Sequence, residues 1–231
     1  IYPTREEYYD AFSTFVGQSE KTVLWQSDAE KIGIGPDDTT TLLANDTNLD
    51  HLKVAGRVNR FNAHVAVVGL EKLGLCSYDQ GVEILNRFPG VSRRFEKIAD
   101  NLYTDYAHTP DKIRGALQLV QEIAGDNVVV VYEGLHNTRQ HFIKDELPSL
   151  FAGIKKLYIV PSYRAREDES LEDLTPEKLC QITQEPDDRQ PATLGNELKE
   201  SITSHVKDGL LVLCLSAGGG DSLDEWLRKN F

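Results

Sequence analysis

The amino-acid sequence predicts an α/β fold with a mostly parallel sheet in its second part. Three short apolar runs, at residues 128–132, 157–160 and 210–215, are unbroken by polar side chains. Such runs are typical of strands that are covered on both faces. Helical patterns lie between them, and strands that alternate with helices favour parallel pairing. The part from about residue 90 to 231 is therefore predicted to be Rossmann-like.

The first part of the chain opens with a helix. Thr4 is followed three residues later by Glu7, which is a capping-box pattern, and Tyr8, Phe12 and Phe15 recur at helical spacing. Residues 21–25 and 39–44 are rich in β-formers and flank a turn of Gly, Pro and Asp, which predicts two strands. Residues 59–73 and 78–87 are predicted to be helical. The sequence Phe-Pro-Gly at 88–90 then indicates a boundary, so residues 1–88 and 89–231 are predicted to be separate domains.

The second part begins with a predicted strand at residues 102–107. Pro110 suits a first helical turn, and an apolar stripe from Ile113 to Ile123 predicts a helix behind it. A further helix is predicted around Phe142 to Phe151, and residues 222–229 predict a terminal helix. The acidic stretch 164–177 and the polar stretch 184–190 are predicted to be solvated surface.

Composition narrows the possible functions. The 25 Lys and Arg residues against 37 Asp and Glu residues give a net charge of −12, which excludes a generally basic nucleic-acid binder. No apolar run approaches the roughly 20 residues of a membrane span, so a soluble cytoplasmic protein without membrane partners is expected. The three cysteines are widely spaced and form no Cys-x-x-Cys pair. Neither a disulfide framework nor a metal site is predicted.

Polar clusters follow four of the predicted strands, at residues 105–110, 133–139, 162–167 and 216–221. Ligands of open α/β sheets bind outside the carboxyl ends of the strands. The last cluster is rich in glycine, and its backbone amides could hold an anion. Each cluster alone is commonplace, but four of them on one sheet edge indicate a binding site.

Individual side chains suggest a division of roles. Arg93 and Arg94 suit phosphate binding, because a guanidinium is always charged and donates in a fork. Asp105 suits bonding to ribose hydroxyls. Tyr106, His108 and Arg139 suit a carboxylate. The plainer reading of the arginine pair is a solvated or salt-bridged surface, which composition alone favours.

Three strings of residues, in this order and spacing, resemble the Mur ligase family. They are Gly-Arg-Val-Asn-Arg-Phe-Asn-Ala at 56–63, Phe-Pro-Gly-Val-Ser-Arg-Arg-Phe-Glu at 88–96 and Asp-Tyr-Ala-His-Thr-Pro at 105–110. The resemblance runs essentially end to end. It implies that residues 1–88 are the latter part of the family's central ATPase domain and residues 89–231 its C-terminal, amino-acid-binding domain.

The resemblance also implies roles at matching positions. Asn59 and Asn62 correspond to asparagines that face adenine, Arg94 with Arg93 to the phosphate-contacting arginine, and Asp105 to the ribose-binding aspartate. The positions that border the incoming amino acid are Tyr106, His108, His136 and Arg139, of which His108 and Arg139 are the catalytic candidates. Such enzymes use ATP and Mg²⁺ to phosphorylate a carboxylate, and an amine then attacks the acyl phosphate. Holding two anionic reactants together should supply most of the acceleration.

The strings are most similar to the branch of peptidoglycan synthesis that joins L-alanine to UDP-N-acetylmuramate. Asn137 and Thr138, with Glu133 upstream, are instead similar to the branch that recycles a cell-wall tripeptide, so the acceptor stays open. Val58 replaces the histidine that the family places before the first asparagine.

The 231 residues contain no Gly-x-x-x-x-Gly-Lys-Ser/Thr loop to cradle phosphates. The family's Mg²⁺ ligands and its sugar-nucleotide domain are expected upstream of residue 1, so these residues alone are expected to be inactive. Two other readings remain, a non-catalytic module that binds a nucleotide or a partner and a dinucleotide-binding domain that uses residues 216–221. Cys214 is expected to be a core residue, and His64 is expected to be packed or surface-exposed rather than functional.

Overall fold

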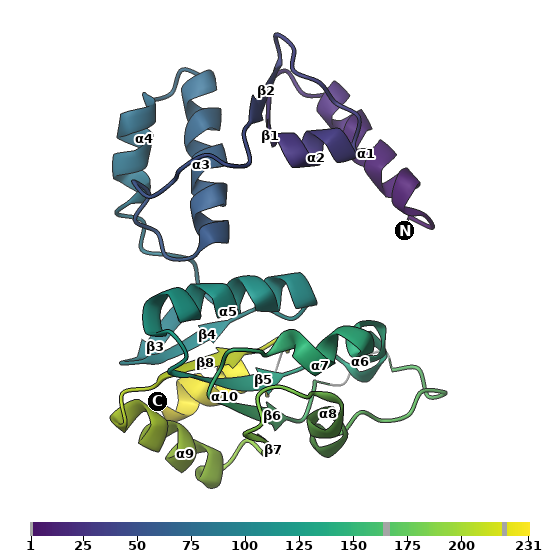
Figure 1. The fold of residues 1–231 in the computed structure, drawn as a ribbon, viewed down its shortest axis with the longest axis vertical. Helices are drawn as coiled ribbons and strands as arrows, with labels where there is room; N and C mark the ends of the chain where they lie inside the picture. Colours follow the sequence, from purple (N-terminus) through teal and green to yellow (C-terminus); the bar gives the residue numbers. More distant parts are fainter. Residues whose placement is uncertain (1, 164–166, 219–220) are drawn as a thin grey trace. The chain divides into compact units, whose positions relative to one another are not determined.

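The computed structural model describes residues 2–163, 167–218 and 221–231, and these form two compact units (Figure 1). The first unit comprises residues up to Val54 together with Val58–Phe88, and the second comprises Ala55–Arg57 with Pro89–Phe231. Each unit has its own secondary structure and its own sheet.

The first unit contains four helices and a small sheet among its described residues. Helix α1 (Arg5–Gly17) starts where the Thr4 hydroxyl accepts the Glu7 amide at 3.1 Å, which satisfies one free N–H of its first turn. Strands β1 (Thr22–Trp25) and β2 (Thr40–Leu43) pair in parallel on either side of α2 (Gln26–Lys31). Helices α3 (Arg57–Lys72) and α4 (Tyr78–Leu85) follow.

The second unit is built on a six-stranded sheet with the order β3-β4-β8-β5-β6-β7. The four central strands are β4 (Leu102–Asp105), β8 (Leu211–Leu215), β5 (Val128–Glu133) and β6 (Lys156–Val160), and all of them are parallel. At the edges, β3 (Glu96–Ala99) is antiparallel to β4, whereas β7 (Arg189–Pro191) is parallel to β6. The predicted α/β class with a mostly parallel sheet is confirmed.

Helices cover both faces of this sheet. In β5, Val128, Val130 and Tyr132 pack with α5 (Pro110–Ala124), α7 (Leu147–Leu150) and α8 (Pro176–Ile182). The alternate residues Val129 and Val131 pack with α9 (Asn196–Lys207) and α10 (Leu223–Asn230) on the other face. Because strand side chains alternate between faces, burial of every β5 residue requires these two separate apolar layers.

The predicted single helix around Phe142 to Phe151 is wrong. The chain instead forms α6 (Asn137–Ile143), a 3₁₀ turn at Lys144–Glu146 and α7. Pro148 lies in the first turn of α7, where a missing N–H is tolerated, and this position favours a new helix start over a continuous helix. Phe142 is 77% exposed and is therefore not part of an apolar helix face.

The sequence reading also missed several elements. These are α2, β3, α8, β7 and α9. Within the described part of the stretches predicted to be solvated surface, most residues are exposed, but Leu174 is buried, so that prediction is wrong in part. In the described ranges, none of the helices has both the length and the hydropathy needed to cross a bilayer.

Candidate functional site

Three of the polar clusters meet at one edge of the second unit's sheet. Strands β4, β8 and β5 are parallel neighbours, so their carboxyl ends lie together. The Ser216 amide donates to the Asp105 carbonyl oxygen at 3.0 Å, and the Ser216 hydroxyl donates to Glu133 Oε2 at 2.7 Å. Ser216 therefore connects the ends of all three strands.

Glu133 organises the turn that follows β8. Its carboxylate is 2% exposed and accepts the Ser216 hydroxyl, the Gly218 amide at 3.3 Å and the Leu223 amide at 3.1 Å. Burial raises the pKa of Glu133, although these donors act in the opposite direction. A Cβ at Gly218 would lie 2.7 Å from Ser222 Cβ and 3.2 Å from Glu133 Oε2, so a glycine is required for this close approach.

The turn that carries the two arginines has an unusual backbone. Arg93 and Phe95 have φ values of 59° and 46°, in the left-handed region that side chains other than glycine rarely adopt. The Arg93 amide donates to Glu96 Oε2 at 2.7 Å, and the Phe95 amide donates to Asp105 Oδ2 at 2.8 Å. The Phe95 ring also stacks on Tyr103 with the ring centroids 4.3 Å apart.

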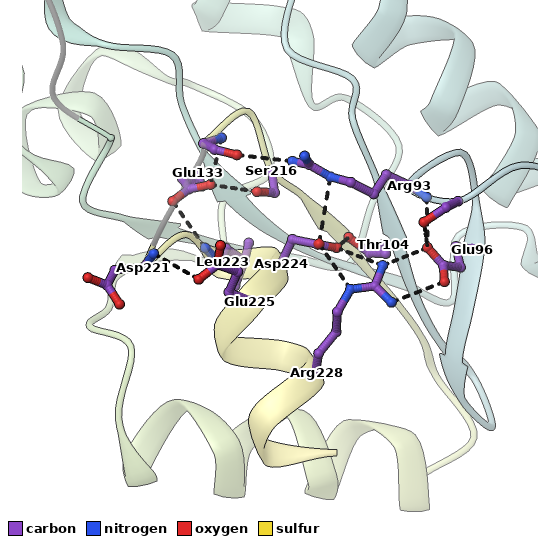
Figure 2. Close-up of polar contacts among 12 residues, drawn as sticks. Arg93, Glu96, Thr104, Glu133, Ser216, Asp221, Leu223, Asp224, Glu225 and Arg228 are labelled. Carbon is purple, nitrogen blue, oxygen red and sulfur yellow. Dashed lines mark hydrogen bonds and ion pairs between the residues drawn. The ribbon is translucent and has the colours of Figure 1, made fainter.

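The Arg93 guanidinium points into the unit, toward α10 (Figure 2). It donates to the Gly218 carbonyl oxygen at 3.1 Å and lies 3.6 Å from Asp224 Oδ2. Its carbon atom Cζ lies 4.6 Å from the centroid of the Tyr106 ring, within range of a cation–π contact. The Arg93 side chain therefore makes its contacts within the second unit. The side chain of the neighbouring Arg94 is exposed.

Asp105 lies at the end of β4 and is 9% exposed. Burial raises its pKa above the ordinary value. The amides of Phe95 and Ala107 lower it, as do the positive charges of Arg94 and Lys112. Asp105 therefore lies in a positively charged neighbourhood, which suits the binding of anions.

His108 has one ring nitrogen committed. Its Nδ1 lies 2.8 Å from the Tyr106 carbonyl oxygen, and a carbonyl only accepts, so Nδ1 carries the proton in this contact. Burial lowers the pKa of His108, and the charges of Lys112, Arg94 and Arg139 lower it further. The ring is therefore neutral at pH 7, with an unprotonated Nε2 that can accept a proton.

His136 and Arg139 lie at the start of α6, which follows β5. The His136 ring packs near Glu167, with its Nδ1 3.8 Å from Glu167 Oε2. The same carboxylate accepts the amides of Asn137 and Thr138 at 3.2 and 3.1 Å. Arg139 is exposed on α6, and its positive charge contributes to the lowered pKa of His108.

Three polar atoms near α6 are buried and have no hydrogen-bond partner among the residues that the structure describes. They are His136 Nδ1, Gln140 Nε2 and Ser162 Oγ. A Cβ at Gly134 would lie 1.3 Å from Gln140 Nε2 and 3.1 Å from Ser162 Oγ, so the last two converge on this glycine. Sequence reasoning passed over Gln140, because its burial follows from the packing of α6 on Tyr132 and not from any pattern.

The first unit contributes Asn59 and Asn62, which lie three residues apart on α3. Both are exposed, and residues at this spacing share one helix face. His64 is buried on the same helix, and its Nδ1 lies 2.9 Å from the Tyr78 hydroxyl. Cys214 is fully buried within β8.

Parts of two sequence clusters fall outside the described residues. These parts are Arg164, Ala165 and Arg166 of the third cluster and Gly219 and Gly220 of the fourth. Across residues 2–163, 167–218 and 221–231, no three His, Cys, Asp or Glu side chains are grouped so that they could hold a metal ion.

Comparison with known proteins identifies relatives across most of the chain. The model of the family described as "Mur ligase, glutamate ligase domain" matches residues 93–218. UDP-N-acetylmuramate–L-alanine ligase of Symbiobacterium thermophilum is 30% identical over 173 residues, which are 72% of this chain and 36% of that protein. The enzyme of the same name from Rickettsia canadensis is 30% identical over 193 residues, or 78% of this chain and 39% of that protein.

A solved structure shares the fold. It is UDP-N-acetylmuramate–alanine ligase of Thermotoga maritima, with a TM-score of 0.68 and 19% identity. The alignment covers 98% of this chain and 54% of that one. The chain spans a little over one third of the length of the two curated relatives.

Proposed function

The chain belongs to the Mur ligase family, and from this premise we propose that it is part of an ATP-dependent ligase that joins L-alanine to UDP-N-acetylmuramate. Two relatives that are UDP-N-acetylmuramate–L-alanine ligases, each 30% identical to this chain, support this assignment. The observation that carries it is the arrangement of His108 with the positive charges of Arg94, Lys112 and Arg139 at one sheet edge. A ligase of this kind must bring together two anionic reactants, and clustered cations with an unprotonated base suit that task.

The proposed reaction has two steps. The γ-phosphoryl group of ATP is transferred to an oxygen of the UDP-N-acetylmuramate carboxylate, and ADP leaves. The amine of L-alanine then attacks the carbonyl carbon, the amide bond forms, and inorganic phosphate leaves with the transferred oxygen. The products are ADP, phosphate and the amide.

The roles proposed on the nucleotide side are those that the family resemblance implies, and the exposure of Asn59, Asn62 and Arg94 is compatible with them. On the first unit, Asn59 and Asn62 share an exposed face of α3 and are the proposed adenine contacts. On the second unit, exposed Arg94 is the proposed contact to phosphate. Asp105 is proposed to accept hydrogen bonds from the ribose hydroxyls of ATP, and its Oδ2 also accepts the Phe95 amide.

On the acceptor side, His108 Nε2 takes the proton that the attacking amine loses. Arg139 neutralises the acceptor carboxylate, and Tyr106 and His136 border it. The ring of Tyr106 lies edge-on to His108 with the centroids 4.7 Å apart, which fixes the orientation of the imidazole. Nε2 therefore has a defined direction in which to accept the proton.

Mg²⁺ is expected to act with ATP, as in phosphoryl transfer generally. Among the described residues, no three His, Cys, Asp or Glu side chains are grouped to hold a metal ion. The 231 residues also lack a Gly-x-x-x-x-Gly-Lys-Ser/Thr loop, and we propose that they need further sequence to complete the ATP site. The reaction takes place in the cytoplasm in this proposal.

A cell-wall tripeptide is the second candidate acceptor. Asn137 and Thr138 occupy the start of α6, and the Asn137 side chain donates to the Glu172 carbonyl oxygen and accepts the Leu174 amide. This side chain is therefore committed to the loop before α8. An arginine, which the alanine-adding branch of the family usually has at this position, could donate to the Glu172 carbonyl oxygen but could not accept the Leu174 amide. Asparagine in place of arginine at position 137 changes the surroundings of the proposed acceptor site. Acceptors longer than L-alanine should therefore be tested.

The assignment is tested with the complete gene product, ATP, UDP-N-acetylmuramate and separate acceptors. We expect amide formation and ADP release with L-alanine, at a higher kcat/KM than with glycine, L-serine or L-alanyl-γ-D-glutamyl-diaminopimelate. Arg139→Ala should raise the acceptor KM by about tenfold or more, because a charge-assisted contact is lost, and should leave the ATP KM near its original value. Preference for the tripeptide would replace L-alanine as the acceptor, and a defect confined to ATP would contradict the role of Arg139.

A further inference from the structure

We propose that Asp224 is a positioning residue for nucleotide binding, because it holds the Arg93 guanidinium and thereby fixes the turn that presents Arg94. The inference rests on the proposed contact between Arg94 and the phosphates of ATP. It assigns different tasks to two adjacent arginines: Arg93 holds the turn, and Arg94 meets the ligand.

The turn needs such a support because its backbone is strained. Arg93 and Phe95, on either side of Arg94, both have left-handed φ values. A residue other than glycine in this region is strained and persists only where its surroundings hold it. The Glu96 carboxylate and the Asp105 carboxylate hold the two amides, and the Arg93 carbonyl oxygen accepts the Tyr106 amide at 2.9 Å.

Asp224 holds the side chain of Arg93. It lies in the first turn of α10 and is 5% exposed. The Thr104 hydroxyl donates to Asp224 Oδ1 at 2.9 Å, while Oδ2 lies 3.6 Å from Arg93 Nε. The carboxylate is thus fixed to β4 on one side and faces the arginine on the other.

A second arginine closes the arrangement into a ring (Figure 2). Arg228 donates to Asp224 Oδ2 through Nε at 3.0 Å, and it makes two hydrogen bonds to the Glu96 carboxylate at 3.1 and 2.6 Å. Glu96 in turn accepts the Arg93 amide. Arg93 is therefore held at its backbone by Glu96 and at its side chain by Asp224, and Arg228 connects the two acids.

Charge distribution separates the two arginines further. The ring contains two arginines and two acids, so its formal charges cancel. The charge of Arg94 lies outside the ring, on an exposed side chain next to Asp105. Loss of the Asp224 charge would leave the Arg93 guanidinium without its carboxylate and free the turn to move, and Arg94 would move with it.

The test is a mutant cycle in the complete gene product, with steady-state kinetics for ATP and a thermal melt of each variant. Asp224→Asn keeps the shape and can still accept from Thr104, but it removes the charge. Glu225→Gln is the matched control, because Glu225 is the next residue on the same helix turn and 44% of its side chain is exposed. Arg93→Lys tests the same ion pair from the other side, since lysine keeps the charge but lacks the fork that reaches both Asp224 and Gly218.

We expect Asp224→Asn and Arg93→Lys to raise the ATP KM by about threefold to tenfold, with the acceptor KM unchanged, and Glu225→Gln to change neither. In an Arg94→Ala background, Asp224→Asn should cause no further rise in the ATP KM. Its effect on the melting temperature should be the same in both backgrounds, because packing does not depend on Arg94.

The outcomes separate the two claims. If Arg94→Ala leaves the ATP KM unchanged, the proposed phosphate contact fails. If Arg94→Ala raises the ATP KM but Asp224→Asn and Arg93→Lys do not, the positioning role is overturned and the phosphate contact stands. An equal rise from Asp224→Asn in both backgrounds also overturns it, because the effect would then not pass through Arg94.

Discussion

His108 shows how a single side chain acquires a chemical state from its surroundings. The Tyr106 carbonyl oxygen fixes the proton on Nδ1, and burial together with neighbouring cations disfavours a second proton. A histidine in solution titrates near pH 6.5 and would be partly charged at neutral pH. In the folded chain the lowered pKa favours the neutral imidazole, which is the form that the proposed proton transfer needs.

The pKa of His108 can be measured directly. Because the folded-state pKa is lowered, the imidazole should stay neutral down to a pH below 6.5 and become protonated only under more acidic conditions. An NMR titration of the ring protons, with His108→Gln for the resonance assignment, measures this value. Arg139→Ala should raise the pKa, since one nearby positive charge is removed, whereas a pKa at or above 6.5 in the original chain would contradict the described surroundings.

Glu96 gives a second prediction, on stability. Hydrogen bonds from Arg228, the Arg93 amide and Ser92 lower the pKa of Glu96 from 4.5 to about 2. A carboxylate with a lowered folded-state pKa stabilises the fold above its unfolded pKa, and this contribution is lost as the pH falls toward the folded value. Because Glu96 and Arg228 are partly exposed, Glu96→Gln should cost only about 1 kcal/mol at pH 7.

The measurement is chemical denaturation of Glu96→Gln and of the original chain between pH 7 and pH 2. The difference in unfolding free energy should be constant above about pH 5 and should shrink as the pH falls from 4.5 toward 2. A difference that grows on acidification would contradict the ion pair with Arg228.

Residue types together with the family resemblance predicted the arginine pair, Asp105 and His108 as site candidates, but not what each side chain contacts. Arg93 and Asp224 are 131 positions apart in the sequence, and no local pattern joins them. The sheet order that brings β4 beside β8 creates this contact. The expectation that Cys214 is a core residue is confirmed, because every residue of β8 is buried.

Close packing of two helices depends on one glycine in the first unit. A Cβ at Gly81 of α4 would lie 2.9 Å from Val67 Cγ1 of α3, which is closer than side chains normally approach. In contrast, Gly69 on α3 has open space at the same position. The two glycines therefore form a matched pair for testing the helix contact.

Gly81→Ala should destabilise the chain by about 1–2 kcal/mol, because overpacking outweighs the better helix propensity of alanine. Gly69→Ala should leave stability unchanged or raise it by up to about 1 kcal/mol. Both are measured by denaturant unfolding monitored at Trp25, which lies in the first unit beside Phe61 with ring centroids 4.6 Å apart. Equal effects of the two substitutions would show that α3 and α4 do not pack as described.

The sequence predicted the central strands better than the edges. Strands β5, β6 and β8 are covered on both faces, and apart from Glu133 at the end of β5 and Lys156 at the start of β6 they consist of apolar and aromatic residues. Edge strand β7 consists of Arg, Gln and Pro, a composition without a strand signal, and it forms because β6 offers an open edge. A pattern of apolar residues does not predict such a strand, because β7 forms through its backbone pairing with β6.

At the scale of the whole molecule, the chain passes from the first unit to the second at Ala55 and returns to the first unit at Val58. Residues Ala55–Arg57 belong to the second unit, where Gly56 has a φ of 84° and a Cβ would lie 2.9 Å from Leu119. Glycine at 56 is part of the string that resembles the Mur ligases, and the structure gives a packing reason for it. The motif thus has a structural role in addition to any role in binding ATP.

In the proposed function, the complete gene product activates a carboxylate by phosphorylation. The most direct test incubates the complete gene product with ATP, L-alanine and UDP-N-acetylmuramate labelled with ¹⁸O in its carboxylate. We expect one labelled oxygen in the released inorganic phosphate for each amide bond formed, since the acyl phosphate must surrender that oxygen when the amine attacks. Label in AMP, or amide formation that leaves the phosphate unlabelled, would contradict the account.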